Sequence, residues 1–164
     1  MAGYRFREYV ADVVRHGAVP GRIRMAALRA AGVEVGQGAQ IAPGVRLRGA
    51  GRFALGAGSG INTDVLIDCN ADVVLGRNVK IGPNCALITS DHSFGPPEDR
   101  CGPPKARPIV IEDGVWLAVG VTVLPGVTIG AGSFLAPNTV VRVSVPPNTM
   151  WAAPSARKIK DLPA

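Results

Sequence analysis

Aliphatic side chains recur every six residues along most of this chain. From residue 111 onward, the positions six apart hold Ile111, Leu117, Val123, Ile129, Leu135 and Val141. The same spacing occurs in three earlier sets, which begin at Val35, Leu55 and Leu75 and lie twenty residues apart. A period of six is neither the 3.6 of a helix nor the 2 of a half-buried strand. It predicts short strands joined by tight turns, with one aliphatic side chain pointing inward per strand and stacked coils sharing a core.

The repeat is interrupted between Leu87 and Ile111. Residues 89–108 contain five prolines and two glycines. Proline has no amide hydrogen to donate to a β-ladder, so this segment is expected to leave the coil as a projecting loop. Ordered loops on rigid scaffolds often carry function. The predicted loop spans residues 88–110 and contains His92 near its start.

The N-terminal residues do not follow the six-residue period. Phe6, Val10, Val13 and Gly17 are spaced for one face of a helix, and Pro20 and Gly21 form a break. A second helix is expected from residue 22 to 31. We therefore divide the chain into an N-terminal helical segment (1–32), the repeat region (33–146) and a C-terminal tail (147–164). The helical segment is basic, so it either caps the open end of the coil, which we favour, or rests on an anionic membrane.

The net charge of +6 changes this picture little. No lysine- or arginine-rich run interleaved with aromatic residues is present, which argues against nucleic acid as a partner. The three cysteines form no CxxC pair and predict neither a disulfide framework nor a cysteine zinc site. No signal peptide and no apolar run long enough to span a bilayer is evident, so a cytoplasmic location is expected, with membrane association of the N-terminal segment as an alternative.

The repeat over roughly residues 33 to 160 resembles that of the hexapeptide-repeat acyltransferases, in particular the O-acetyltransferase branch that includes maltose, galactoside and surface-polysaccharide enzymes. This resemblance implies an all-β fold: a left-handed parallel β-helix of about five coils, with an N-terminal helical cap and one extruded loop. It also implies acetyl-coenzyme A as donor, no metal, and a homotrimer with the cofactor bound in a groove between subunits.

The same resemblance implies a role for His92, in the sequence TSDHSF, because family members carry a catalytic histidine at the start of this loop. A hydroxyl is a poor nucleophile until its proton is removed, and histidine titrates in the range that serves this at neutral pH. Asn62, thirty residues upstream, matches the acceptor-site asparagine of the family and is expected to hold the acceptor or the developing oxyanion. Asp68 and Asn70 are expected to line the acceptor pocket.

On the donor side, residues 108–133 match the family closely. The cofactor-binding residues implied by the resemblance are Trp116, Ala118, Val119, Pro137, Arg142 and Lys160. Several of these positions depart from the usual family pattern, which is Trp-Ile-Gly where this chain has Trp-Leu-Ala at 116–118. Arg142 and Lys160 are expected to meet the phosphates of the cofactor.

The sequence therefore predicts an acetyl-coenzyme A-dependent O-acetyltransferase that acts on a hydroxyl of a sugar or polysaccharide precursor. An antibiotic O-acetyltransferase and a non-catalytic β-helix scaffold remain alternatives, because the repeat specifies a fold and not a chemistry. A carbonic-anhydrase-like zinc site needs three histidines, and the chain has only His16 and His92.

Overall fold

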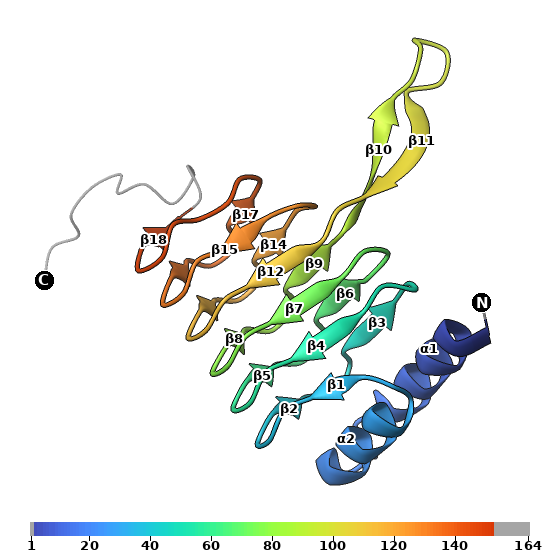
Figure 1. The fold of residues 1–164 in the computed structure, drawn as a ribbon, viewed down its shortest axis with the longest axis vertical. Helices are drawn as coiled ribbons and strands as arrows, with labels where there is room; N and C mark the ends of the chain where they lie inside the picture. Colours follow the sequence, from blue (N-terminus) through green and yellow to red (C-terminus); the bar gives the residue numbers. More distant parts are fainter. Residues whose placement is uncertain (1, 153–164) are drawn as a thin grey trace, which may run out of the picture.

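The chain folds into a parallel β-helix with two helices at its N-terminal end and one hairpin that projects from its side (Figure 1). The computed structural model describes residues 2–152. Three parallel sheets, here called faces A, B and C, form the sides of the solenoid. Each turn runs from face A through face B to face C, and every strand pairs with those one turn above and below, so all contacts are between neighbouring turns.

The strands of the three faces are short. Face A contains β1 (Glu34–Val35), β4 (Phe53–Leu55), β7 (Val73–Leu75), β12 (Ile109–Ile111) and β15 (Thr128–Ile129). Face B contains β2 (Gln40–Ile41), β5 (Gly60–Ile61), β8 (Lys80–Ile81), β13 (Trp116–Leu117), β16 (Phe134–Leu135) and β18 (Met150–Trp151). Face C contains β3 (Arg46–Arg48), β6 (Leu66–Asp68), β9 (Ala86–Ile88), β14 (Thr122–Val123) and β17 (Val140–Val141).

The six-residue pattern is confirmed as the inward-facing core of the solenoid. On face B, the ladder register aligns Ile41, Ile61, Ile81, Leu117 and Leu135 in one row. All five side chains are buried. Each turn thus adds three aliphatic side chains to a continuous apolar column, and burial of this column supplies the main driving force for folding.

The solenoid has six turns on face B rather than the expected five. The sixth strand, β18, pairs with β16, so Phe134 lies opposite Met150. Val145 bridges Ile129 on face A, sixteen residues later in the chain. The preceding turn spans eighteen residues, from Ile111 to Ile129. Because the last turn is two residues shorter, its inward positions fall out of the six-residue register and a fixed-period search misses it.

The corner between faces B and C, here called the B–C corner, is built from residues in the left-handed backbone conformation. One such residue occupies this corner in each of five successive turns, with φ between 57° and 80°: Gly44, Asp64, Asn84, Gly120 and Asn138. Only glycine, asparagine and aspartate adopt this conformation at small cost. Backbone hydrogen bonds link the turns here, for example from the amide of Asn138 to the carbonyl of Val119 (2.9 Å).

Replacing Gly120 with alanine should destabilise the protein. Gly120 has φ +70°, and an added Cβ would collide with the side-chain oxygen of Asn138 on the next turn. We expect a loss of about 1–3 kcal/mol in the free energy of unfolding, from backbone strain together with displacement of that side chain. Chemical denaturation of Gly120→Ala measures this loss. Gly17→Ala is the control, because no atom lies within 4 Å of a Cβ there; equal stability of the two variants would contradict the prediction.

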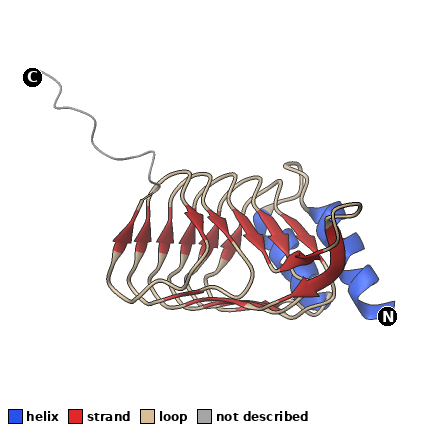
Figure 2. Cartoon of the chain, turned by 90° about the horizontal axis from the view of Figure 1, so that it is seen from above, coloured by secondary structure: helices blue, strands red, loops and turns tan. Residues whose placement is uncertain are grey.

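The two helices, α1 (Ala2–Val14) and α2 (Gly21–Ala30), lie at the end of the stack opposite β18 (Figures 1 and 2). Both helices contact strands of the first turn. They cover the end of the apolar column with Ala11, Val14, Met25 and Leu28, which are buried. This is the position of the cap that the sequence analysis favoured.

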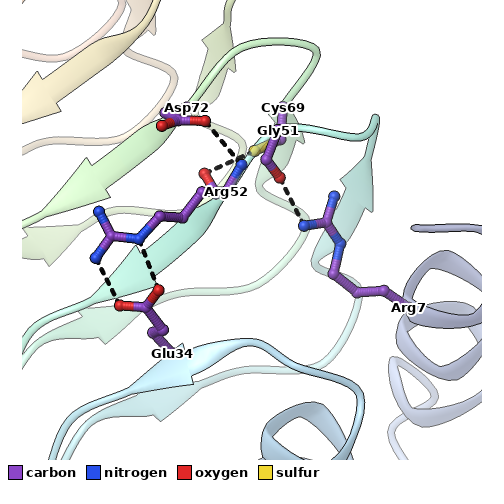
Figure 3. Close-up of polar contacts among 6 residues, drawn as sticks. All are labelled: Arg7, Glu34, Gly51, Arg52, Cys69 and Asp72. Carbon is purple, nitrogen blue, oxygen red and sulfur yellow. Dashed lines mark hydrogen bonds and ion pairs between the residues drawn. The ribbon is translucent and has the colours of Figure 1, made fainter. Parts of the chain in front are cut away.

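The buried face of α1 differs from the expected one. Phe6 and Val13 are 57% and 49% exposed, whereas Arg7, Ala11 and Val14 are buried. The guanidinium of Arg7 donates to the carbonyl oxygens of Gly49 and Gly51, the latter at 2.6 Å (Figure 3). Carbonyls at the turn between faces C and A need donors, and Arg7 supplies them to Gly49 and Gly51. The polar contact therefore fixes the rotation of α1, and the apolar pattern alone predicted the wrong face.

An ion pair fastens α1 to the solenoid and should make stability depend on pH. Arg48 donates a hydrogen bond of 2.7 Å to Asp12, and this bond holds the pKa of Asp12 below its ordinary value of 3.8. A carboxyl group whose pKa is lowered in the folded state stabilises the fold at any pH above its ordinary pKa. This stability is lost as the pH falls through the pKa of the folded state. Asp12→Asn should therefore be less stable than the wild type at pH 6. The difference should shrink below pH 3.8, as measured by denaturant midpoints; a constant difference would contradict it.

Candidate active site

The predicted loop leaves the solenoid as a two-stranded antiparallel hairpin, β10 (Ser90–Phe94) and β11 (Cys101–Ala106) (Figure 1). It departs at the corner between faces C and A, here called the C–A corner. The amide of Arg107 donates to the carbonyl of Thr89 (2.9 Å) and closes the base of the hairpin. The prolines of β11 are tolerated because this strand has a partner on one side only. The projection predicted from sequence is thus confirmed, and the segment is ordered as strands.

His92 lies on β10 with an exposed side chain that is fixed by one hydrogen bond across the hairpin. Its Nδ1 is 2.7 Å from the carbonyl oxygen of Gly102. A carbonyl can only accept, so Nδ1 carries the proton and donates it. The lone pair of the neutral imidazole is then on Nε2, and that atom is able to accept a proton from a substrate. No sequence pattern marks the contact with Gly102, because this contact depends on the pairing of β10 with β11.

Asp91 does not contact the imidazole. Its carboxylate accepts a hydrogen bond of 2.7 Å from the backbone amide of His92. Asp91 therefore shapes the backbone of β10, and the orientation of the ring depends on Gly102.

Polar side chains gather at the foot of the hairpin. Asp68, at the end of β6, accepts hydrogen bonds from the hydroxyl and the backbone amide of Ser90 and from the side-chain amide of Asn70 (2.6 Å). Thr89 is buried, and its hydroxyl donates to the carbonyl of Asp68 (2.8 Å). Asp68 and Asn70 therefore lie at the same corner as the hairpin that carries His92. Ser90 and Thr89 were missed by the sequence analysis, since no spacing marks them.

Asn62 lies at a different corner. It follows β5 at the B–C corner, with an exposed side chain whose oxygen accepts from the amide of Thr63 (2.7 Å). Among the described residues, none accepts a hydrogen bond from its Nδ2. The Asn62 side chain thus presents a donor to the surface.

Three of the six predicted cofactor-binding residues lie along the same B–C corner as Asn62. Ala118 and Val119 follow β13, and Pro137 follows β16 one turn later. Ala118 is buried, while Val119 and Pro137 are exposed. Together these residues form a ridge with small or rigid side chains. Both backbone groups of Ala118 and the carbonyl of Val119 are hydrogen-bonded, whereas the amide of Val119 and the carbonyl of Pro137 have no partner among the described residues.

The remaining predicted residues are dispersed. Trp116 points outward from face B and is 54% exposed. Its ring packs against that of Phe134 at a tilt of 47°, with ring centroids 4.6 Å apart. Arg142 is exposed after β17 at the C–A corner. Lys160 lies outside the described residues.

One chain therefore presents two separate groups of predicted site residues. His92, Asp68 and Asn70 lie at the C–A corner, whereas Asn62, Ala118, Val119 and Pro137 lie at the B–C corner. Face C separates the two corners. The sequence analysis placed His92 and Asn62 in one site, and a single solenoid does not bring them together.

The two buried cysteines are poor nucleophiles. Burial raises the pKa of Cys69 and of Cys85 above the ordinary thiol value. Their Sγ atoms donate to the carbonyls of Arg52 (3.2 Å) and Ala118 (3.0 Å). Both side chains therefore stay protonated and act as small apolar residues.

Residues 2–152 contain no cluster of three histidine, cysteine or acidic side chains that could hold a metal ion. Within the same range, neither helix is long and apolar enough to cross a membrane. Neither a metal centre nor a membrane span is thus part of the described structure.

Comparisons with known proteins show similarity to a family of bacterial transferases. Residues 108–142 match the sequence family described as bacterial transferase hexapeptide (six repeats). The galactoside O-acetyltransferase of Lactococcus lactis is 33% identical over 65% of this chain and 53% of its own length. Nodulation protein L of Rhizobium meliloti is 34% identical over 76% of this chain and 68% of its own length. The chain spans about half the length of the first curated relatives that it matches.

A solved structure resembles the whole fold. The hexapeptide-repeat acetyltransferase of Vibrio cholerae, complexed with acetyl-coenzyme A, superposes with a TM-score of 0.80 and 28% sequence identity. The alignment covers 98% of this chain and 88% of the other. The similarity thus includes the helices, the solenoid and the hairpin.

Proposed function

Because the chain belongs to the hexapeptide-repeat acyltransferases, which wind as left-handed parallel β-helices, we propose that it transfers an acetyl group from acetyl-coenzyme A to a hydroxyl of a sugar or polysaccharide precursor. The observation that carries this proposal is the hydrogen bond from His92 Nδ1 to the Gly102 carbonyl. It leaves Nε2 as an exposed base on a rigid hairpin, which is the group that acyl transfer to a hydroxyl needs.

In the proposed reaction, His92 Nε2 removes the proton of the acceptor hydroxyl as its oxygen attacks the thioester carbonyl. The carbon–oxygen bond forms and the carbon–sulfur bond breaks. The proton on Nε2 passes to the departing thiolate, so the imidazole returns to its neutral form. Throughout, the Gly102 carbonyl stabilises the imidazolium by accepting the Nδ1–H bond.

The donor is proposed to lie along the B–C corner. Its pantetheine arm carries amides that need hydrogen-bond partners, and on the ridge of Ala118, Val119 and Pro137 the Val119 amide and the Pro137 carbonyl have no other partner among the described residues. The solved relative from Vibrio cholerae is a complex with acetyl-coenzyme A. We assign Trp116 to the wall of the site that holds the pantetheine arm. We assign Arg142 and Lys160 to binding of the phosphates of the cofactor.

The two separated corners support a homotrimer as the active form. In the cyclic packing that we propose, the C–A corner of one subunit faces the B–C corner of the next. His92 of one protomer then meets the Asn62 side chain of its partner, whose free Nδ2 stabilises the developing oxyanion. Sedimentation or light scattering measures the subunit number, and an active monomer would overturn this arrangement.

A sugar acceptor is favoured by the galactoside O-acetyltransferase among the relatives. The test is release of free thiol from acetyl-coenzyme A against a panel of sugars and hydroxylated antibiotics. Turnover with a sugar supports the proposal. Turnover with antibiotics alone would mean that the acceptor is an antibiotic and not a sugar. Binding of coenzyme A is measured by the stability that it adds, which is about 2.7 kcal/mol at a hundredfold excess over its dissociation constant. If there is neither turnover nor such stabilisation, the protein is a non-catalytic scaffold.

A further inference from the structure

An open groove runs between helix α2 and face B. Its volume is about 940 Å³, within the range of small-molecule sites. Arg22, Met25 and Arg29 of α2 form one wall, and Asn62 and Trp116 lie on the opposite side. We call this feature the cap groove. It reaches Asn62, so a ligand in it lies against one of the two groups of site residues.

The floor of the cap groove has a depression at Gly60, because glycine has no side chain. The outward row on face B runs from Gln40 through Gly60 and Lys80 to Trp116 in successive turns. At Gly60, the nearest atom to an added Cβ would be in the Lys80 side chain, at 3.8 Å. The depression at Gly60 is therefore open, with Lys80 beside it and the indole of Trp116 one turn further.

The charges around the cap groove are all positive. Arg22, Arg29 and Lys80 line it, and none of the described residues that line it is acidic. Arg29 makes only long bonds to the carbonyls of Val35 (3.3 Å) and Gly36 (3.4 Å). Lys80 donates one bond, to the carbonyl of Gly58 (2.7 Å). Both side chains keep further donors for a ligand, in a site whose field attracts anions.

We propose that the cap groove holds the acceptor, and that the acceptor is an anionic sugar whose phosphate or carboxylate is bound by Arg22, Arg29 and Lys80. This inference rests on the proposed acetyl transfer, because it places the sugar hydroxyl beside Asn62. Phosphate and carboxylate share the chemistry that arginine recognises, namely two oxygens that accept paired N–H bonds. The ring of the sugar fills the hollow at Gly60, next to Trp116.

The test compares three acceptors with one ring: glucose 1-phosphate, glucuronic acid and glucose. We expect a KM at least about tenfold lower for an anionic sugar than for glucose, since hydrogen bonds to charged groups contribute strongly. If glucose 1-phosphate has the lower KM of the two anionic sugars, the bound group is a phosphate. If glucuronic acid has the lower KM, the bound group is a carboxylate. Arg29→Gln should raise the KM for the anionic sugar about tenfold and leave the KM for acetyl-coenzyme A unchanged. Arg5→Gln is the matched control, because Arg5 is exposed on α1 outside the groove.

Binding of the same sugars without donor separates this inference from the proposed function. Calorimetric titration of the wild-type chain should detect an anionic sugar, with weaker binding in Arg29→Gln and in higher salt. Binding without turnover would support the cap groove while the proposed reaction fails. Equal KM values for glucose and the anionic sugars, or no calorimetric binding of either anion, would overturn the inference. So would a raised KM for acetyl-coenzyme A in Arg29→Gln, which would assign the groove to the donor's phosphates.

Discussion

Replacing His92 with alanine should lower kcat for acetyl transfer by at least about a hundredfold, as expected for loss of a general base. The acceptor hydroxyl then has to lose its proton to water, which is a weaker base. Binding of both substrates should change little, because the imidazole acts on a proton that moves only in the transition state. Thiol release from acetyl-coenzyme A at saturating acceptor measures the effect. The melting temperature should stay unchanged, since the side chain is exposed on the hairpin.

His16→Ala is the matched control for this substitution. His16 is the only other histidine, and it is exposed between α1 and α2. Its loss should leave kcat within about twofold of the wild type, because surface substitutions away from a site have small effects. If His92→Ala keeps full activity, the proposed mechanism fails; if both variants lose activity equally, the effect does not come from a base on the hairpin.

Replacing Arg24 with methionine should lower the free energy of unfolding by about 3 kcal/mol or more. Arg24 is only 3% exposed, and its guanidinium donates to four backbone carbonyls. These belong to Val14 (2.8 Å), Ile41 (3.1 Å), His16 (3.1 Å) and Val19 (2.9 Å). Methionine fills much of the same volume but donates to none of them. The bonds to Val14 and Ile41 are buried, and each of these two carbonyls left without a donor costs about 1–3 kcal/mol.

Denaturant unfolding and thermal melting both measure this loss. For a chain of this size we expect a fall of about 10 °C in the melting temperature. Arg22→Met, on the same helix with an exposed side chain, should change the free energy of unfolding by no more than about 0.5 kcal/mol. An equal effect of the two substitutions would mean that helix α2 loses stability for a reason other than the four carbonyls.

The solenoid could be predicted from sequence because its cause is local and periodic. An inward side chain such as Ile61 or Leu117 has to be aliphatic in every turn, so the requirement repeats and can be counted. The helical cap could be predicted only in part. Its length follows from the residues that break the repeat, but its rotation depends on Arg7 and Arg24 meeting carbonyls of other segments. Such contacts leave no periodic trace.

The candidate site was likewise predictable only in part from the sequence. His92 stands where the repeat stops, but its catalytic role, like the role of Asn62, is predicted from the resemblance to the family. The carbonyl that fixes the imidazole belongs to Gly102, whose sequence position carries no chemical mark. The separation of His92 from Asn62 follows from which corner each residue occupies. That requires counting residues around a turn, and the turns without the hairpin span twenty, eighteen or sixteen residues.

A single backbone hydrogen bond, from the amide of Arg107 to the carbonyl of Thr89, returns the chain to the point where the hairpin left it. The strand after the excursion, β12, resumes its register on β7, with Ile109 opposite Val73. The ladder of the solenoid therefore does not depend on the tip of the hairpin, between His92 and Gly102. Evolution can lengthen, shorten or rewrite this tip while the scaffold and the contact of His92 with Gly102 stay intact, so the reach of the hairpin can change without renewed selection for folding.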